Sequence, residues 1–324
     1  MNENVKKQLF RLRKPETGTV VALLVLVAVF YIMSRGLFFS PVNLRSVIRV
    51  AAQVGIVTVG QGLLMIAGEF DLSVGSVYGF AGVLFIAFQS SLNPGLSVVL
   101  VLALMVAIGF LNAFFVFKLK IPSLIATLGG LFTYRGLIYL VTGGFGTHIP
   151  EQNRASALIR LLGGETLGGV NNIFIWYLLF AVICTVILAR TRFGNRVYAV
   201  GDDPLSAFSR GVSPIRVKWV CFMICSFMAG LSAIATVCNS GTAYPTLGSE
   251  LELQSIASCV VGGIALSGGV GTIWGAAVGA FFLSTIQSGL ILVGAPPYWF
   301  ITFVGVVLIA AVAVNRVLSE RRRY

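Results

Sequence analysis

Apolar runs of roughly the length that crosses a lipid bilayer follow one another along almost the whole chain. A membrane-spanning helix needs about 20 mostly apolar residues. Segments that meet or approach this length lie at about 18–34, 47–67, 74–90, 95–117, 121–142, 172–189, 217–238, 253–268, 272–293 and 298–315. The pattern predicts an all-α polytopic membrane protein with about ten transmembrane helices, organised as a single transmembrane domain over residues 1–324.

Composition supports a bilayer as the solvent. Only 10% of the residues are charged and 57% are hydrophobic, whereas about 25% of the residues in a soluble domain are charged. The segments 74–90 and 253–268 are short and rich in glycine. If both are re-entrant, the number of full spans falls from ten to eight.

The basic residues predict the orientation. With ten spans both termini lie on one side, and 17 of the 23 Lys and Arg residues then fall on that side. Basic residues favour cytoplasmic connections, so the sequence predicts cytoplasmic termini, a cytoplasmic tail at 1–17 and a periplasmic loop at 143–171. Within that loop, the run ASALIRLL is expected to form a short surface helix. The net charge of +12 is therefore attributed to orientation, not to nucleic acid binding.

A polar block interrupts the apolar pattern at 190–216, and eight charged residues lie between Arg190 and Lys218. Placing them in hydrocarbon would cost on the order of 20 kcal/mol, at about 2.5–3.5 kcal/mol each, so the block is expected to be a cytoplasmic loop. Pro204 marks a helix start and Gly211 a helix stop, which predicts a short helix. On composition alone, this helix suits docking to a partner and a simple solvated connection equally well.

Charged residues also interrupt two apolar regions. Glu69 and Asp71 lie between two predicted spans, where a carboxylate is expensive and commonly functional. Asp71 suits capping a helix that begins near Ser73, and it also suits lining a cavity at a broken helix, since the two roles can coexist. Ser249 and Glu252 have the spacing of a capping box at the start of 253–268.

Other polar and small residues suit helix packing as well as transport. The uncharged polar residues Asn112, Gln61, Gln254 and Gln287 could bond a polar solute or neighbouring helices. Glycines spaced by four at 75 and 79, and at 271, 275 and 279, are typical of close helix contact. Packing within one subunit is favoured over a dimer interface.

Several catalytic patterns are absent from the sequence. It contains no G-x-x-x-x-G-K-[ST] phosphate loop and no H-E-x-x-H or G-x-S-x-G motif. Its single histidine and the five cysteines within or beside apolar segments predict neither a metal site nor a disulfide framework. The chain is therefore expected to be a pathway without its own source of energy. It would be the membrane subunit of an ATP-driven transporter, with an ion-coupled secondary transporter as the alternative and a membrane enzyme as a distant third.

Four motifs carry a family resemblance. They are GEFDLSVGS at 68–76, IPSLIATLGGLFTYRGL at 121–137, TRFGNRVYAVGDDPLSAFSRGV at 191–212 and ELELQSIASCVVGGIALSGGVGTIWGAAVGA at 250–280. With these motifs in order, the chain from about residue 40 onward resembles the permease subunits of bacterial ABC importers for monosaccharides of the ribose, xylose, arabinose and galactofuranose type. Glu69 is a departure, because many members of that family carry no charge at this position.

The resemblance implies a type II fold, as in vitamin B12-type importers, in the bacterial inner membrane and in contact with its lipid. It implies a second permease subunit, identical or a sister chain, an ABC ATPase subunit that carries ATP and Mg, and a periplasmic sugar-binding protein. No cofactor is expected on this chain. The segment at 200–212 would be the coupling helix, with the expected coupling residues Gly201, Asp202, Asp203, Pro204, Ala207, Arg210 and Gly211. The expected lining or gating residues of the translocation path are Asp71, Asn112, Glu252 and Gln287.

Overall fold

A computed structural model describes residues 15–166, 169–296 and 298–321 of the chain. All but the last three residues of the predicted tail at 1–17 lie outside this range. Each of the ten predicted apolar segments overlaps one helix. These helices are α2 (Pro15–Met33), α3 (Pro41–Ile66), α4 (Val74–Phe88), α5 (Pro94–Phe117), α6 (Ser123–Thr142), α9 (Asn172–Arg190), α12 (Pro214–Ser240), α13 (Leu251–Val261), α14 (Ile273–Leu292) and α15 (Tyr298–Arg321).

Length and hydropathy divide these ten helices into six candidate membrane spans and four, α2, α4, α13 and α15, with shorter apolar stretches. Within the described residues, six helices are long and apolar enough to cross a membrane, namely α3, α5, α6, α9, α12 and α14. By contrast, α4 has 15 residues and α13 has 11. At 1.5 Å per residue they measure about 22 and 16 Å, less than the hydrocarbon thickness of about 30 Å.

Two expectations about α13 are wrong. The predicted segment 253–268 ends as a helix at Val261, because the glycines that follow adopt turn conformations, with Gly263 at φ 88° and Gly268 at φ 83°. The expected capping box is also missing. The N-cap position is held by Glu250 with φ 65°, and no side chain caps the helix.

Short helices and strands lie in the connections between the main helices. The 3₁₀ turn η1 (Leu37–Phe39) joins α2 to α3. Strand β1 (Thr147–His148) pairs antiparallel with β2 (Thr242–Ala243), which ties the loop at 143–171 to the end of α12. That loop also contains α7 (Glu151–Arg154) and α8 (Ala157–Gly163). The expected short helix in ASALIRLL is thereby confirmed as α8.

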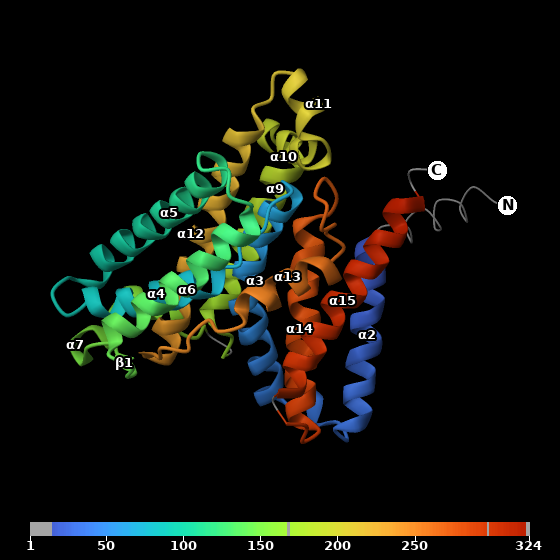
Figure 1. Cartoon of the computed structure of the whole chain (residues 1–324). Coiled ribbons are helices and arrows are strands. Elements are labelled where there is room, and N and C mark those ends of the chain that lie inside the picture. The colour runs from blue at the N-terminus through green and yellow to red at the C-terminus, as the bar shows by residue number, and fades with distance from the viewer. Residues whose placement is uncertain (1–14, 167–168, 297, 322–324) are drawn as a thin grey trace.

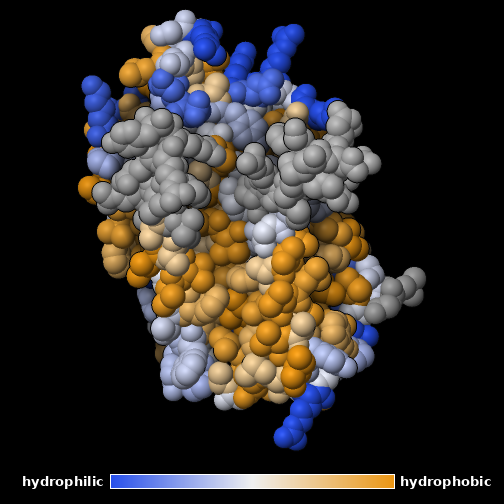
Figure 2. All heavy atoms as spheres, turned by 90° about the vertical axis from the view of Figure 1, so that its right-hand side faces the viewer, coloured by the Kyte–Doolittle hydropathy of each residue, from blue (hydrophilic) through white to orange (hydrophobic). Residues whose placement is uncertain are grey.

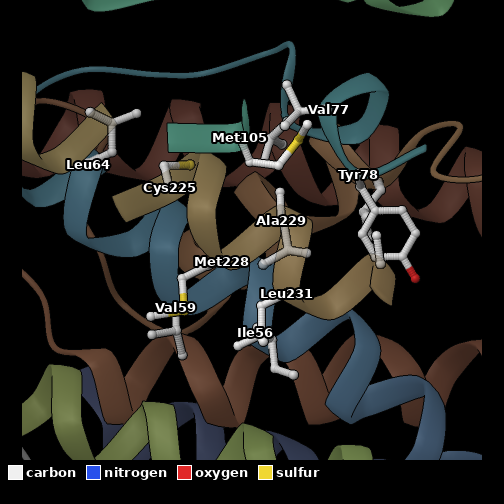
Figure 3. Close-up of a cluster of buried hydrophobic side chains, with 14 of the residues drawn as sticks. Ile56, Val59, Leu64, Val77, Tyr78, Met105, Cys225, Met228, Ala229 and Leu231 are labelled. Atoms are coloured by element: carbon white, nitrogen blue, oxygen red, sulfur yellow. The ribbon is translucent and has the colours of Figure 1, made fainter. Parts of the chain in front are cut away.

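Helices α3 and α12 form the centre of the bundle. In each of them, 78% of the most apolar window is buried, against 22–28% for α5, α6 and α9. Figure 3 shows side chains from α3 (Ile56, Val59), α5 (Met105) and α12 (Met228, Leu231) in this core. The outer helices therefore keep wide apolar faces that suit contact with lipid or with another membrane subunit.

The glycines spaced by four pack inside the subunit, as favoured from the sequence. A Cβ atom added to Gly275 would lie 2.1 Å from the carbonyl oxygen of Gly262, and one added to Gly279 would lie 1.9 Å from that of Ser258. Real Cβ atoms do not approach backbone so closely, so the approach of α14 to the end of α13 requires glycine at these two positions of α14.

The two ends of the molecule differ (Figure 1). The short helix α11 (Pro204–Ser209) projects at one end, where α2 also begins and α15 also ends, while β1 and α7 lie towards the other end. Figure 2 shows a broad hydrophobic belt on the side of the molecule turned to the viewer, with hydrophilic residues above and below it. Such a belt is the expected surface of a protein embedded in a bilayer.

Candidate functional site

The predicted short helix of the polar block is confirmed as α11, which follows α10 (Arg192–Asp202). Asp203 is its N-cap. The carboxylate accepts hydrogen bonds from the backbone N–H of Leu205 at 2.9 Å and from the hydroxyl of Ser206 at 2.5 Å. Pro204 occupies the first turn, and Gly211 follows the helix with φ 80°. The Ser206 hydroxyl first, and then backbone N–H groups, hold the pKa of Asp203 below its usual range.

The two faces of α11 differ in exposure. Leu205 is 80% exposed and Phe208 is 68% exposed, whereas Ala207 is 3% exposed and faces the body of the protein. Sequence reasoning missed Leu205 and Phe208 as site residues, although two large apolar residues three positions apart in a polar block were a usable signal. Of the seven expected coupling residues, Gly201 and Ala207 are buried, and the other five are exposed.

Four glycines form a tight contact beneath α10 and α11, which we name the glycine junction. They are Gly68, Gly201, Gly268 and Gly269. A Cβ atom on Gly201 would lie 1.8 Å from the carbonyl oxygen of Ile66, and one on Gly268 would lie 2.8 Å from the Cα of Gly68. The N–H of Gly269 also donates to the Ile66 carbonyl at 2.9 Å. The end of α3, the end of α10 and the turn between α13 and α14 therefore meet backbone to backbone.

An ion pair lies in the same region. The ammonium group of Lys218 in α12 is 2.7 Å from Oε1 of Glu69, which follows α3. The sequence identified Glu69 as a costly carboxylate between two spans and Lys218 as a basic residue on the cytoplasmic side, without a link between them. Because 149 positions separate the two residues, no local pattern indicated their contact.

A buried polar cluster fills the space between α3–α4, α5 and α6. Asp71 Oδ1 accepts from the backbone N–H of Ser73 at 2.8 Å and from its hydroxyl at 2.6 Å. The Nδ2 group of Asn112 donates to Asp71 Oδ2 at 3.3 Å and to Ser73 Oγ at 2.9 Å. Tyr134, which sequence reasoning missed, donates its hydroxyl to Asn112 Oδ1 at 2.9 Å. The expected helix cap at Asp71 is not formed as predicted, because Ser73 holds the N-cap position of α4 without a side-chain cap, and Asp71 bonds Ser73 itself just before the helix.

The other two expected path residues lie elsewhere. Glu252 packs its carboxylate against Gly75 of α4, and its Oε2 atom is buried without a hydrogen-bond partner. Among charged groups, Arg135 has the largest electrostatic effect on the Glu252 carboxylate. The Arg135 guanidinium itself donates to the carbonyl oxygens of Pro245 and Leu247 at 3.0 and 2.9 Å. Gln287 lines a cleft between α3 and α14. The structure thus brings Asp71 and Asn112 together, but not Glu252 or Gln287.

Metal chemistry has little support in the described residues. Among them, no three His, Cys, Asp or Glu side chains gather as a possible metal site. All five cysteines are buried and unpaired.

Apolar helices in a hydrophobic belt, with polar groups buried between them, define a polytopic membrane protein. A family model described as "Branched-chain amino acid transport system / permease component" matches residues 43–312. The chain therefore belongs to this family of transport permeases, whose members are non-catalytic subunits of ABC importers. The identification of an importer permease from its sequence motifs is confirmed.

The curated relatives carry a more specific name. The autoinducer 2 import system permease protein LsrC of Photorhabdus luminescens is 34% identical over 298 residues, which are 91% of this chain and 88% of that protein. LsrC of Escherichia coli K12/DH10B is 36% identical over 265 residues, or 80% and 75% of the two chains. LsrC of Salmonella typhi is 33% identical over 300 residues, or 91% and 84%. No solved structure matches this chain.

Proposed function

We propose that the chain forms one half of the path through which an ATP-driven importer carries a small monosaccharide-type solute, such as autoinducer 2, into the cell. The names of the LsrC relatives support this substrate class, as does the resemblance of the four sequence motifs to monosaccharide permeases. A second permease subunit completes the path, and a periplasmic binding protein delivers the solute. An ABC ATPase subunit holds ATP and Mg.

The proposed topology has ten membrane helices in a type II arrangement, with both termini and α11 in the cytoplasm. The start of α2 and the end of α15 lie at the same end as α11 (Figure 1), which supports this orientation. The short helices α4 and α13 then cross only part of the hydrocarbon. The connections after α3, α10 and α13 lie near the cytoplasmic surface, where they meet at the glycine junction.

The exposed pair Leu205 and Phe208 on α11 is the observation that carries the coupling role. Apolar side chains at 80% and 68% exposure, on a helix at the predicted cytoplasmic end, form a small knob that suits insertion into an apolar cleft of the ATPase. The coupling segment comprises Gly201, Asp202, Asp203, Pro204, Ala207, Arg210 and Gly211. Within it, Ala207 and Gly201 brace the segment from below, since both are buried.

The four proposed path residues differ in their proposed roles. Asp71 and Asn112 hold the connection between α3 and α4 in one shape, so they would act as a gating cluster. Glu252 and Gln287 lie outside that cluster. An ion-coupled transporter, the alternative, would instead use Asp71 as its ionisable group and would need no ATPase.

The test uses the full importer reconstituted in vesicles with its ATPase. Leu205→Ser and Phe208→Ser should abolish co-purification of the ATPase and ATP-dependent uptake of autoinducer 2. Leu119→Ser, at an exposed apolar residue in the connection after α5, is the matched control and should change neither. Uptake that persists without ATP and follows a proton gradient would contradict the proposal.

A further inference from the structure

A cleft of about 290 Å³ lies between the start of α3 and the second half of α14. In the proposed orientation both helix segments are at the periplasmic end, away from α11 (Figure 1). Hydroxyl and amide groups dominate its polar lining, and none of the lining residues is charged. The polar lining residues are Ser40, Asn43, Ser46, Ser284, Gln287 and Ser288.

Part of this lining is fixed by internal hydrogen bonds. Asn43 donates from Nδ2 to the carbonyl oxygen of Phe38 at 2.7 Å, and it accepts at Oδ1 from the hydroxyl of Ser288 at 2.5 Å. The Asn43 amide therefore has one orientation, and it fixes the direction of the Ser288 hydroxyl. A site with fixed polar groups is preorganised for a ligand.

Other polar groups in the cleft have no partner. The hydroxyl oxygen of Ser284 is buried, with the side chain 2% exposed, and it makes no hydrogen bond. A serine in a membrane helix readily bonds a carbonyl one turn earlier, so an unpartnered one is unusual. The side chain of Gln287 is only partly buried; it lines the same cleft, and its amide makes no hydrogen bond to any described residue. Unpartnered buried polar groups are unfavourable unless a ligand or water satisfies them.

The neighbouring face of α3 indicates how the cleft is reached. Arg45 and Arg49 are exposed on this face, and Arg49 lies about 12 Å along the helix from Pro41, at 1.5 Å per residue. Charged side chains are costly in lipid, so this part of α3 must border water or protein. A second cavity of about 310 Å³ contains both arginines and shares Val42 and Ser46 with the cleft. The cleft therefore opens beside a polar space and not only towards lipid.

We propose that the α3–α14 cleft is a binding site for a neutral polyhydroxylated solute on its route through the permease. Hydroxyl and amide groups exchange hydrogen bonds with the hydroxyls of such a solute, while Val42, Val50 and Ile291 cover its C–H face. Because no charged residue lines the cleft itself, an anion or zwitterion bound there would lose water without a counter-charge in direct contact, although Arg45 and Arg49 lie in the adjoining cavity. This inference rests on the proposed function, and it assigns the solute to a defined place.

The first test measures transport kinetics in the reconstituted importer. Ser284→Ala and Gln287→Ala should raise the KM for autoinducer 2 by at least about fivefold, since each removes a hydrogen bond to the solute. Ser226→Ala is the matched control, because the Ser226 hydroxyl of α12 is also buried and unpartnered but lies outside the cleft. Unchanged KM values in both cleft variants would overturn the proposal.

The second test does not depend on transport. In membranes, a Gln287→Cys variant should react with a membrane-impermeant maleimide added from the periplasmic side, and the five buried native cysteines give little background. Millimolar autoinducer 2, D-ribose, D-xylose and L-arabinose are the probes, with L-leucine as a zwitterionic comparison. Protection by one or more sugars but not by leucine supports the site, even if ATP-driven uptake is not observed. Protection by leucine alone, or by none of the probes, would overturn it.

Discussion

The ammonium nitrogen of Lys218 lies 2.7 Å from a carboxylate oxygen of Glu69, and both side chains are largely buried, at 12% and 14% exposure. The pair joins the beginning of α12 to the turn that follows α3. Only two residues further on, Asp71 anchors the start of α4. The connection between α3 and α4 is therefore held on one side by this ion pair and on the other by the buried polar cluster.

Replacing Lys218 with Met should destabilise the subunit. The Glu69 carboxylate would remain mostly buried without its counter-charge, and breaking such a pair costs up to about 3–5 kcal/mol when it is fully buried. Because both side chains keep some exposure, a loss near the lower limit is expected. The thermal midpoint of the purified subunit in detergent, followed by tryptophan fluorescence, measures the effect.

The double variant Glu69→Gln/Lys218→Met separates the ion pair from other roles of Lys218. It removes both charges together, so it should recover most of the stability lost in the single variant. Arg216→Gln, at an exposed residue two positions earlier, is the control and should leave the midpoint unchanged. A double variant as unstable as Lys218→Met would show that the pair is not the cause.

Gly201→Ala should disrupt the glycine junction. Its Cβ would collide with the backbone carbonyl of Ile66, and a backbone atom cannot rotate away as a flexible side chain can. Overpacking of this kind costs about 1–3 kcal/mol. Gly129→Ala in α6 has open space around the new Cβ, and it should be neutral or stabilising by up to about 1 kcal/mol. Thermal midpoints of the two variants, compared with wild type, measure the difference.

The same junction gives a second expectation for Gly201→Ala. If α10 and α11 transmit movement through these contacts, the variant should lose uptake but keep binding of the ATPase, because the exposed knob of Leu205 and Phe208 is intact. Loss of ATPase binding with a normal thermal midpoint would place Gly201 in the docking surface instead.

Local sequence signals predicted most of the fold. Apolar length located all ten main helices, and Pro204 with Gly211 located α11, because both signals act within a few residues. The end of α13 was missed since hydropathy does not distinguish a helix from the apolar, glycine-rich turn that begins at Gly262. Only backbone conformation, with Gly263 and Gly268 at positive φ, separates the two.

The site was predicted less completely, for a different reason. Asp71 and Asn112 were each identified as costly polar residues, but their contact joins residues 41 positions apart. Tyr134 carries no signal of its own, because a tyrosine in an apolar helix is common at membrane interfaces. The partners of Glu69 and Gly201 are likewise set by packing between distant helices, which no periodicity in the chain encodes.

Acid should weaken the cap of α11 only at low pH. The pKa of Asp203 is lowered in the folded protein, chiefly by the Ser206 hydroxyl. A carboxylate with a lowered pKa stabilises the fold above its unfolded pKa, and that contribution is lost as the pH falls through the folded pKa. Between pH 8 and pH 5, where even the unfolded pKa of an Asp lies below the working pH, α11 should not change.

Ser206→Ala tests the cause of this shift. It removes the first donor to Asp203, so the pKa should rise and the acid transition of α11 should move to higher pH. The fluorescence anisotropy of a maleimide dye attached to a Phe208→Cys variant, titrated from pH 7 to lower pH, follows the helix, since the five native cysteines are buried. Ser209→Ala is the control, because the Ser209 hydroxyl donates to the Leu205 carbonyl and not to Asp203. Equal midpoints of the acid transition in the parent protein, Ser206→Ala and Ser209→Ala would exclude the Ser206 bond as the cause of the lowered Asp203 pKa.

Asp71→Asn distinguishes a structural carboxylate from an ion-coupling one. The Asn side chain keeps an acceptor for the N–H and hydroxyl of Ser73, whereas its amide nitrogen faces the Nδ2 group of Asn112. Turning the Asn112 amide by 180° resolves that conflict, since its oxygen then accepts from the new amide. Its nitrogen can donate to the Tyr134 hydroxyl, which is able to accept as well as donate. The variant is therefore expected to keep ATP-dependent uptake within about twofold of wild type, with a small loss of stability of about 1 kcal/mol.

Asn112→Leu is the complementary change and should be worse. It leaves Asp71 Oδ2 and the Tyr134 hydroxyl without their partner in a buried cluster, and each orphaned group costs about 1–3 kcal/mol. The thermal midpoint should fall well below that of Asp71→Asn, and uptake should fall with it. Complete loss of uptake in Asp71→Asn at a normal thermal midpoint would reverse the expected order, in which Asn112→Leu is the more severe change. It would assign the carboxylate a role in carrying charge, because the Asn side chain preserves the shape of the cluster and removes only the ionisable group.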